Sequence, residues 1–137
     1  YRSSRGLGDV YKRQEWTVRT IMVHIVAASY LYSERLMGKP FSKFEFDLDS
    51  LNLIDDLMLE LEKIDKNLIE QVYREDEEVT FETSKGESSA KVSVILSMII
   101  FHATEHRAQI VAALDKNNER SINLDEYSIF GYLRDNN

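Results

Sequence analysis

Apolar residues recur every three or four positions along three long stretches of this chain, which is the spacing of one helix face. The first stretch covers residues 17–37, and Thr17 can cap its start. Gly38 and Pro40 follow directly. Glycine tolerates the left-handed backbone that often ends a helix, and proline cannot continue one. The pattern therefore predicts a helix over residues 17–37.

The second stretch, over residues 51–72, combines an apolar stripe with a charged opposite face. The stripe begins at Leu51 and ends at Val72, and either Asp47 or Asp49 can cap the helix. This pattern is typical of an amphipathic helix whose charged face is in contact with water.

The third stretch, over residues 93–116, differs from the others because its first part is apolar on nearly every side. Ser93 can cap this helix, and Asn117 and Asn118 can end it. A helix that is apolar all round is usually buried. We therefore expect residues 94–101 to lie at the centre of the fold.

Between the second and third helices, the period of the pattern changes to that of a strand. Val79 and Phe81 alternate with polar residues, and Lys85 and Gly86 supply a turn. A more polar strand then continues to Ala90. These features predict a small β-hairpin, which should pack against the helices because an isolated hairpin is only marginally stable.

The C-terminal segment predicts one short helix over residues 125–133, with Tyr127, Phe130 and Leu133 as the residues that dock it. The fold class is therefore all-α with a hairpin insertion. A four-helix bundle contains four long helices, whereas the pattern supplies three. We expect the first bundle helix to be missing.

An unusual segment stands at the N-terminus, where that helix would belong. Residues 4–14, SRGLGDVYKRQ, are similar to a translated transposon-end adapter of the kind used in sequencing libraries. We expect residues 1–14 to be non-native and residues 15–137 to form one helical domain. The alternative is a natural basic arm. If the helix is missing, an exposed apolar groove should remain in its place, and such a surface promotes association.

Composition and charge exclude several classes of function. The net charge is −7, which opposes binding to nucleic-acid phosphates. No apolar run approaches the roughly 18 residues of a membrane span. The chain contains no cysteine, so disulfides, thiolate metal sites and a cysteine nucleophile are excluded. We expect a cytoplasmic protein without nucleic-acid or membrane partners, in which any metal ligand is histidine, carboxylate or water.

The chemistry that remains centres on the three histidines of the chain. His102 and His106 are four residues apart, so they share one helix face. His24 lies on the apolar face of the first predicted helix. If these helices pack together, three imidazoles can bind a divalent ion such as zinc, nickel, copper or iron and leave a position open for water or substrate. The alternative is that the histidines are core residues without a metal.

Glu105 lies between the paired histidines in the sequence HATEH. This sequence matches the H-x-x-E-H pattern of inverted zinc proteases. We reject that interpretation, because those enzymes need a downstream carboxylate ligand in a much larger domain. Glu105 can instead act as a proton shuttle, or it is simply a flanking surface acid.

Four segments occur in this order: TVRTIMVHIVAASYLYSERLMG, VTFETSKGES, ILSMIIFHATEHRAQIVAAL and LDEYSIFGYL. Together they resemble the DinB/YfiT-like superfamily. The resemblance implies a four-helix bundle of the up-down-down-up type, assembled as a homodimer, with a divalent metal held by His24, His102 and His106. Glu105 and Ala108 depart from the family pattern, which often has histidine and glycine at these positions.

The resemblance also implies a metal-dependent enzyme with a small-molecule substrate. Characterised relatives transfer low-molecular-weight thiols or use them in isomerisation, and others are assigned as metal hydrolases. We predict an S-transferase that joins a low-molecular-weight thiol to small electrophiles. The alternatives are a metal-dependent hydrolase, a non-catalytic stress protein that binds a metal or small molecule, and a purely structural bundle.

Overall fold

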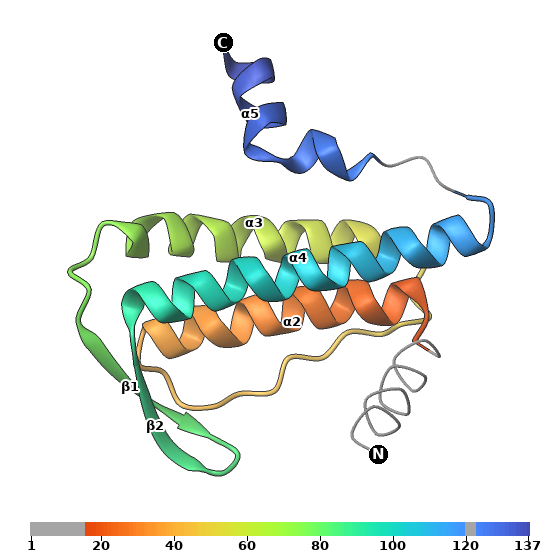
Figure 1. Ribbon diagram of the computed structural model, residues 1–137. Helices are drawn as coiled ribbons and strands as arrows, with labels where there is room; N and C mark the ends of the chain where they lie inside the picture. The colour runs from red at the N-terminus through yellow and green to blue at the C-terminus, as the bar shows by residue number, and fades with distance from the viewer. Residues whose placement is uncertain (1–15, 120–122) are drawn as a thin grey trace, which may run out of the picture.

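The computed structural model describes residues 16–119 and 123–137, so the segment predicted to be non-native lies outside the described residues. Within the described ranges the fold is mostly helical, with one two-stranded antiparallel sheet (Figure 1), as the sequence predicts. The elements, in chain order, are α2 (Val18–Leu36), α3 (Leu53–Val72), β1 (Glu78–Thr83), β2 (Gly86–Lys91), α4 (Val92–Lys116), the 3-10 helix η1 (Leu124–Tyr127) and α5 (Ile129–Asn136).

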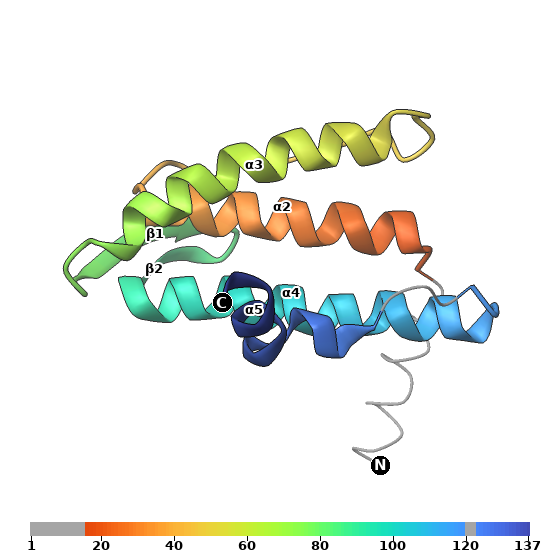
Figure 2. The ribbon, with the colours of Figure 1, turned by 90° about the horizontal axis from the view of Figure 1, so that it is seen from above.

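The long helices pack around α2. This helix contacts both α3 and α4, whereas α3 and α4 meet each other over a smaller area (Figure 2). α2 and α3 run in the same direction because residues 37–52 return along the helices, and α4 runs the opposite way (Figure 1). These directions match the last three helices of an up-down-down-up bundle. α2 begins as predicted, because Thr17 Oγ1 accepts the N–H of Thr20.

The hairpin between α3 and α4 also follows the predicted alternation. Val79 pairs with Ala90, and Phe81 pairs with Ser88. Gly86 has a φ of 115° at the turn, a conformation that glycine adopts readily and other residues do not. The inner face of the hairpin joins α2 and α4 in one hydrophobic cluster, formed by Leu36, Val79, Val92 and Ile95.

A second cluster joins α2 to α3, and the returning loop covers one side of it. Its buried members are Val26, Leu53, Leu57 and Ile64. In the loop, Phe44 lies between Tyr30 and Phe46, with ring centroids 4.8 Å from each. Aromatic pairs at this spacing add packing energy beyond the area they bury, so they hold the loop against α2.

The predicted start of α3 is wrong. The helix begins at Leu53, and the predicted cap Asp47 instead accepts the N–H of Asp49 and closes a turn ahead of the helix. Leu51 therefore precedes the helix. It is 97% exposed, so its predicted place in the apolar stripe is also wrong.

The predicted cap of α4 is wrong as well. Ser93 lies inside the helix, which begins at Val92. The capping group comes from Asp76 in the preceding loop. Its Oδ1 accepts the N–H of Ser93 at 2.8 Å, and its Oδ2 accepts the hydroxyl of the same residue at 2.9 Å. These hydrogen bonds, the backbone one first, lower the pKa of Asp76 below its ordinary value of 3.8.

We expect Asp76→Ala to lower the urea midpoint of unfolding at pH 7, because the variant leaves the start of α4 without its acceptor. Since the pKa of Asp76 is lowered by folding, its contribution is complete above about pH 4 and is lost as the pH falls through the folded-state pKa. The difference in urea midpoint between the wild type and Asp76→Ala should therefore become smaller at low pH. Glu75→Ala, which removes a neighbouring exposed carboxylate, is the matched control. Equal midpoints for Asp76→Ala and the wild type at pH 7 would contradict the capping role.

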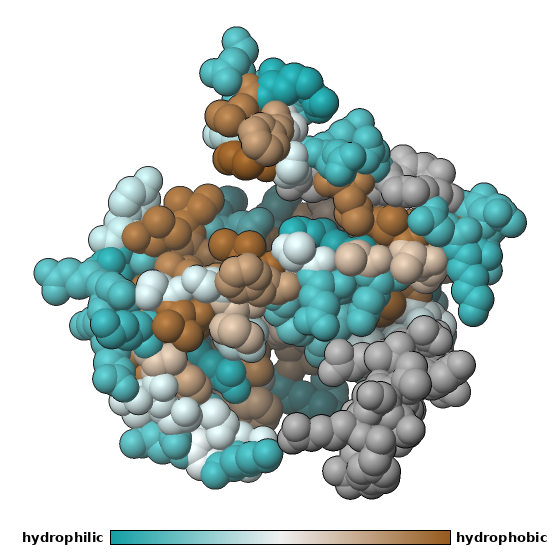
Figure 3. Space-filling model, in the orientation of Figure 1, coloured by the Kyte–Doolittle hydropathy of each residue, from teal (hydrophilic) through white to brown (hydrophobic). Residues whose placement is uncertain are grey.

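Residues 94–101 are less buried than predicted. Ile95 and Ile99 are buried, but Val94, Ile100 and Phe101 are 51%, 64% and 69% exposed. They lie on sides of α4 that no other described element covers. Figure 3 shows apolar side chains at this surface. An apolar groove of about 360 Å³ lies here, between α3 and α4. It is lined by Asp65, Leu68, Ile69, Val72, Leu96, Ile99 and Ile100.

The C-terminal segment forms two short helices instead of one. Ser128 lies between η1 and α5, and its hydroxyl accepts the N–H of Gly131 and caps α5. Phe130 and Leu133 are 79% and 45% exposed, so their predicted docking on the long helices is wrong. The side chain of Tyr127 lies outside what the structure describes. α5 stands apart from the three long helices (Figure 1).

Candidate metal centre

α2 and α4 bring together all three histidines that the sequence analysis selected. His24 lies in the second turn of α2, and His102 and His106 lie one turn apart in the middle of α4. Because the two helices pack along their length in opposite directions, the three imidazoles face one another. Their ring centroids are 4.4–4.8 Å apart.

The spacing of the ring nitrogens suits a single metal ion. Nε2 of His24 and Nε2 of His102 are 3.0 Å apart, and one nitrogen from each histidine lies within 4.8 Å of the others. Two nitrogens bound to zinc at tetrahedral geometry would lie about 3.3 Å apart. The three side chains could therefore hold one ion after small rotations, and a fourth position would stay open.

Gln109 orients the most buried of the three histidines. The side chain of His106 is 4% exposed, and its Nδ1 lies 2.7 Å from Oε1 of Gln109. An amide oxygen can only accept, so Nδ1 is the donor of this hydrogen bond, and Nε2 is the nitrogen that remains to bind an ion. Metal-binding histidines usually donate a hydrogen bond from the ring nitrogen that does not bind the ion, as His106 does here. The sequence analysis noted Gln109 on the same helix face but did not assign it this role.

Trp16 packs on the histidines from the start of α2. Its ring centroid is 5.2 Å from that of His24 in an edge-on arrangement and 6.4 Å from that of His106, with the latter rings nearly parallel at 22°. In the sequence, Trp16 stands at helical spacing from Ile21 and Ile25, so the apolar stripe of the first helix includes it. The sequence analysis did not assign Trp16 to the site.

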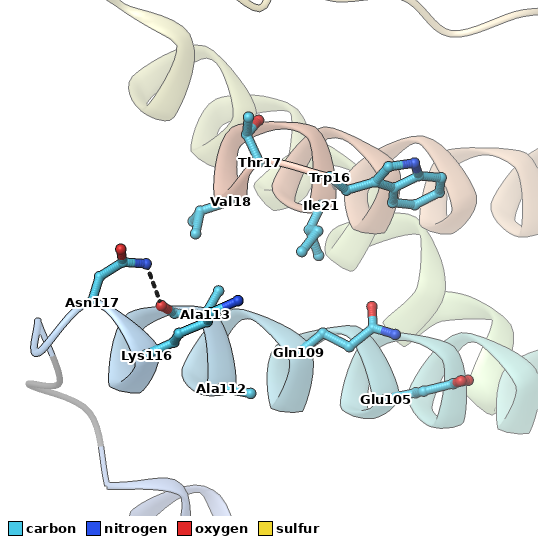
Figure 4. A pocket seen from close by; sticks show the side chains of 10 residues that line it. All are labelled: Trp16, Thr17, Val18, Ile21, Glu105, Gln109, Ala112, Ala113, Lys116 and Asn117. Atoms are coloured by element: carbon cyan, nitrogen blue, oxygen red, sulfur yellow. Dashed lines mark hydrogen bonds between the residues drawn. The ribbon is translucent and has the colours of Figure 1, made fainter. Parts of the chain in front are cut away.

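An open cavity of about 580 Å³ begins beside the histidines and runs between the start of α2 and the second half of α4 (Figure 4). It is lined by Trp16, Thr17, Val18, Ile21, Glu105, Gln109, Ala112, Ala113, Lys116 and Asn117. Trp16 and Gln109 contact the histidines and also line the cavity, so the two features form one site. A volume of this size suits a small organic ligand.

The two departures from the expected family pattern differ in their position. Glu105 is exposed and lines the cavity, next to His106 in the chain. Ala108 is exposed and is not among the residues that line the cavity. The change at Ala108 therefore leaves the candidate site intact, whereas Glu105 contributes a carboxylate to it.

A sequence model described as the DinB family matches residues 8–128, which is most of the chain. This chain belongs to the DinB family. The match covers both helices that carry the histidines of this DinB protein, and it confirms the family that the sequence resembles. No curated protein and no solved structure matches the chain. In the described ranges of the DinB protein, none of the helices has the length and apolar character to span a bilayer.

Proposed function

We propose that this DinB protein is a divalent-metal-dependent enzyme that joins a low-molecular-weight thiol to small electrophiles. The observation that carries the proposal is the convergence of three imidazoles that contact Trp16 and Gln109, two residues that line an open cavity. Three protein ligands with an open position are typical of catalytic metal sites, whereas structural sites are usually closed by four. The choice of a thiol as the nucleophile rests on the family.

The residues of the chain would have distinct roles in this reaction. His24, His102 and His106 would hold the ion, with His106 kept in the required tautomer by Gln109. A bound divalent ion would lower the pKa of the thiol that reacts. Trp16 would cover the histidines and keep part of the site free of bulk water. Glu105 is a candidate acceptor for the thiol proton, because it lines the same cavity.

Metal binding can be measured with the chain's own fluorescence, because Trp16 is its single tryptophan and packs directly on two of the histidines. We expect one equivalent of Co²⁺ to quench the emission of chelator-treated protein, and excess Zn²⁺ to displace the cobalt and restore it. Mg²⁺, which prefers oxygen ligands, is the control and should change nothing. If Co²⁺ leaves the emission unchanged and dialysis detects no bound cobalt, the metal site is wrong.

The reaction can be tested with monochlorobimane and a panel of thiols, each with and without Zn²⁺. In the proposed transfer a sulfur–carbon bond forms, the carbon–chlorine bond breaks, chloride leaves with the bonding electrons and the thiol proton is released. Turnover that needs both metal and thiol supports the proposal. Metal-dependent ester hydrolysis without a thiol would favour a hydrolase, and metal binding without either reaction would favour a non-catalytic binding protein.

The homodimer and the cytoplasmic location stay predictions from the sequence.

A further inference from the structure

The two ends of the cavity carry opposite charges. Glu105 and Gln109 line the end beside the histidines, whereas Lys116 and Asn117 line the other end (Figure 4). Lys116 is ten residues beyond His106 on the same helix, which corresponds to a separation of about 15 Å along the axis. The cavity is therefore lined by a carboxylate near the candidate metal centre and by a lysine whose backbone position is well separated from it along α4.

Lys116 is available to a ligand. Its side chain lies along α4 on the same side as Gln109 (Figure 4). Among the described residues it forms no ion pair. The N-terminus of α2 lies at the same end, since Thr17 and Val18 also line the cavity. The partial positive charge of a helix N-terminus adds to that of the lysine, so this end favours an anion.

The wall between the two ends is apolar. Val18 and Ile21 come from α2, and Ala112 and Ala113 come from α4. A chain of carbon atoms can lie there without leaving polar groups unpaired, whereas a ligand that is polar along its whole length would lose hydrogen bonds to water. The cavity therefore fits a ligand with an apolar middle and a charged end.

We propose that the substrate that enters at the histidines carries a carboxylate at its far end, and that Lys116 recognises this group. The inference rests on the proposed function, because it assumes that the reacting group lies at the histidines. One ammonium group balances one negative charge, which favours a carboxylate over a phosphate dianion. Lys116 is then a specificity-determining residue that does not take part in the chemistry.

Two thiols of equal length, 8-mercaptooctanoate and 8-mercaptooctanol, test this proposal because they differ only in the charge of the far end. Their binding is measured by Trp16 emission and by equilibrium dialysis, with zinc-loaded and zinc-free protein. We expect the wild type to bind the carboxylate about fivefold more tightly than the alcohol, which is the upper range for an exposed ion pair. Mercaptoacetate, which is too short to reach Lys116, should bind independently of that residue.

Three variants separate Lys116 from the general charge of the protein. Lys116→Met should bind the two long thiols equally, and Lys116→Glu should prefer the alcohol. Lys66→Met removes the same charge from an exposed position on α3 and should keep the fivefold preference. The proposal would be overturned if Lys116→Met kept the preference for the carboxylate, or if Lys66→Met lost that preference to the same extent. It would also be overturned if the wild type bound neither long thiol.

The zinc-free protein makes the failure of this proposal distinguishable from the failure of the proposed function. If the histidines bind no metal, the metal-dependent reaction is wrong, but zinc-free protein should still prefer the carboxylate. If metal binding and thiol transfer are both found and Lys116→Met keeps the preference, only the role of Lys116 is wrong.

Discussion

Replacing His106 with alanine is expected to weaken Zn²⁺ binding at least about 100-fold. Loss of a partner outside the ligand set typically costs 10–100-fold in metal affinity, and His106 is proposed as a ligand itself. It is also the most buried of the three histidines and the one that Gln109 orients. Its removal leaves two imidazoles, one on each helix, which cannot enclose an ion.

The variant needs two controls. Glu105→Gln changes the neighbouring residue, which is exposed and outside the histidine trio, so it should bind Zn²⁺ with wild-type affinity. The second control is His106→Gln, which keeps more of the buried side-chain volume than His106→Ala does. If both variants lose Zn²⁺ binding and both keep the helical circular dichroism of the wild type, unfolding is excluded as the cause. Undiminished zinc content in folded His106→Ala would show that the site is assigned wrongly.

Thermal unfolding gives an independent measure of the same site. A ligand that binds only the folded state stabilises it, by about 2.7 kcal/mol when its concentration is 100 times its dissociation constant. Zn²⁺ should therefore raise the melting temperature of the wild type. The same Zn²⁺ concentration should leave the melting temperature of His106→Ala almost unchanged.

Leu36→Ala is expected to give the largest loss of stability, about 2–5 kcal/mol in the free energy of unfolding. Leu36 is 1% exposed and packs at the end of α2 against Val79, Val92 and Ile95, so it connects three elements. Alanine would leave a cavity that these elements cannot all close at once. Since a domain of this size is stable by only about 5–15 kcal/mol, this is a large part of the total.

The matched control is Leu51→Ala, the same substitution at a residue that is 97% exposed. A surface change of this kind usually alters stability by less than about 0.5 kcal/mol. Urea unfolding followed by circular dichroism measures both variants. Similar midpoints for Leu36→Ala and Leu51→Ala would mean that the cluster at the hairpin contributes little.

Periodicity predicted the helices and the hairpin well, because both depend on which face of an element is apolar. It failed where the decisive partner is distant in the chain. The capping group of α4 comes from Asp76, 17 residues before Ser93, and a local pattern does not reveal such a partner. The predicted burial of residues 94–101 failed for a related reason. Hydropathy shows that Phe101 can be buried, but burial requires an element that covers it.

The residues of the candidate site also fall into two groups, those that the sequence indicated and those that it did not. The three histidines could be selected from the sequence because each lies on an apolar helix face, and the structure brings all three together. Trp16 and Lys116 were not selected. Trp16 stands at helical spacing from Ile21 and Ile25, so the sequence includes it in the apolar stripe of the first helix but does not show that it contacts the histidines. Lys116 is an exposed charged residue in the last turn of its helix, so no apolar pattern indicates it. Their contribution depends on how α2 crosses α4.

The long separation of the histidines in the chain has a consequence for the lifetime of the folded protein. His24 and His102 are 78 residues apart, so the complete trio exists only while α2 is docked on α4. Neither helix can form the complete trio of histidines by itself. An ion held by the trio would have to leave before the two helices separate. Bound metal would then slow unfolding. The metal-bound protein would resist proteolysis for longer than its equilibrium stability alone suggests.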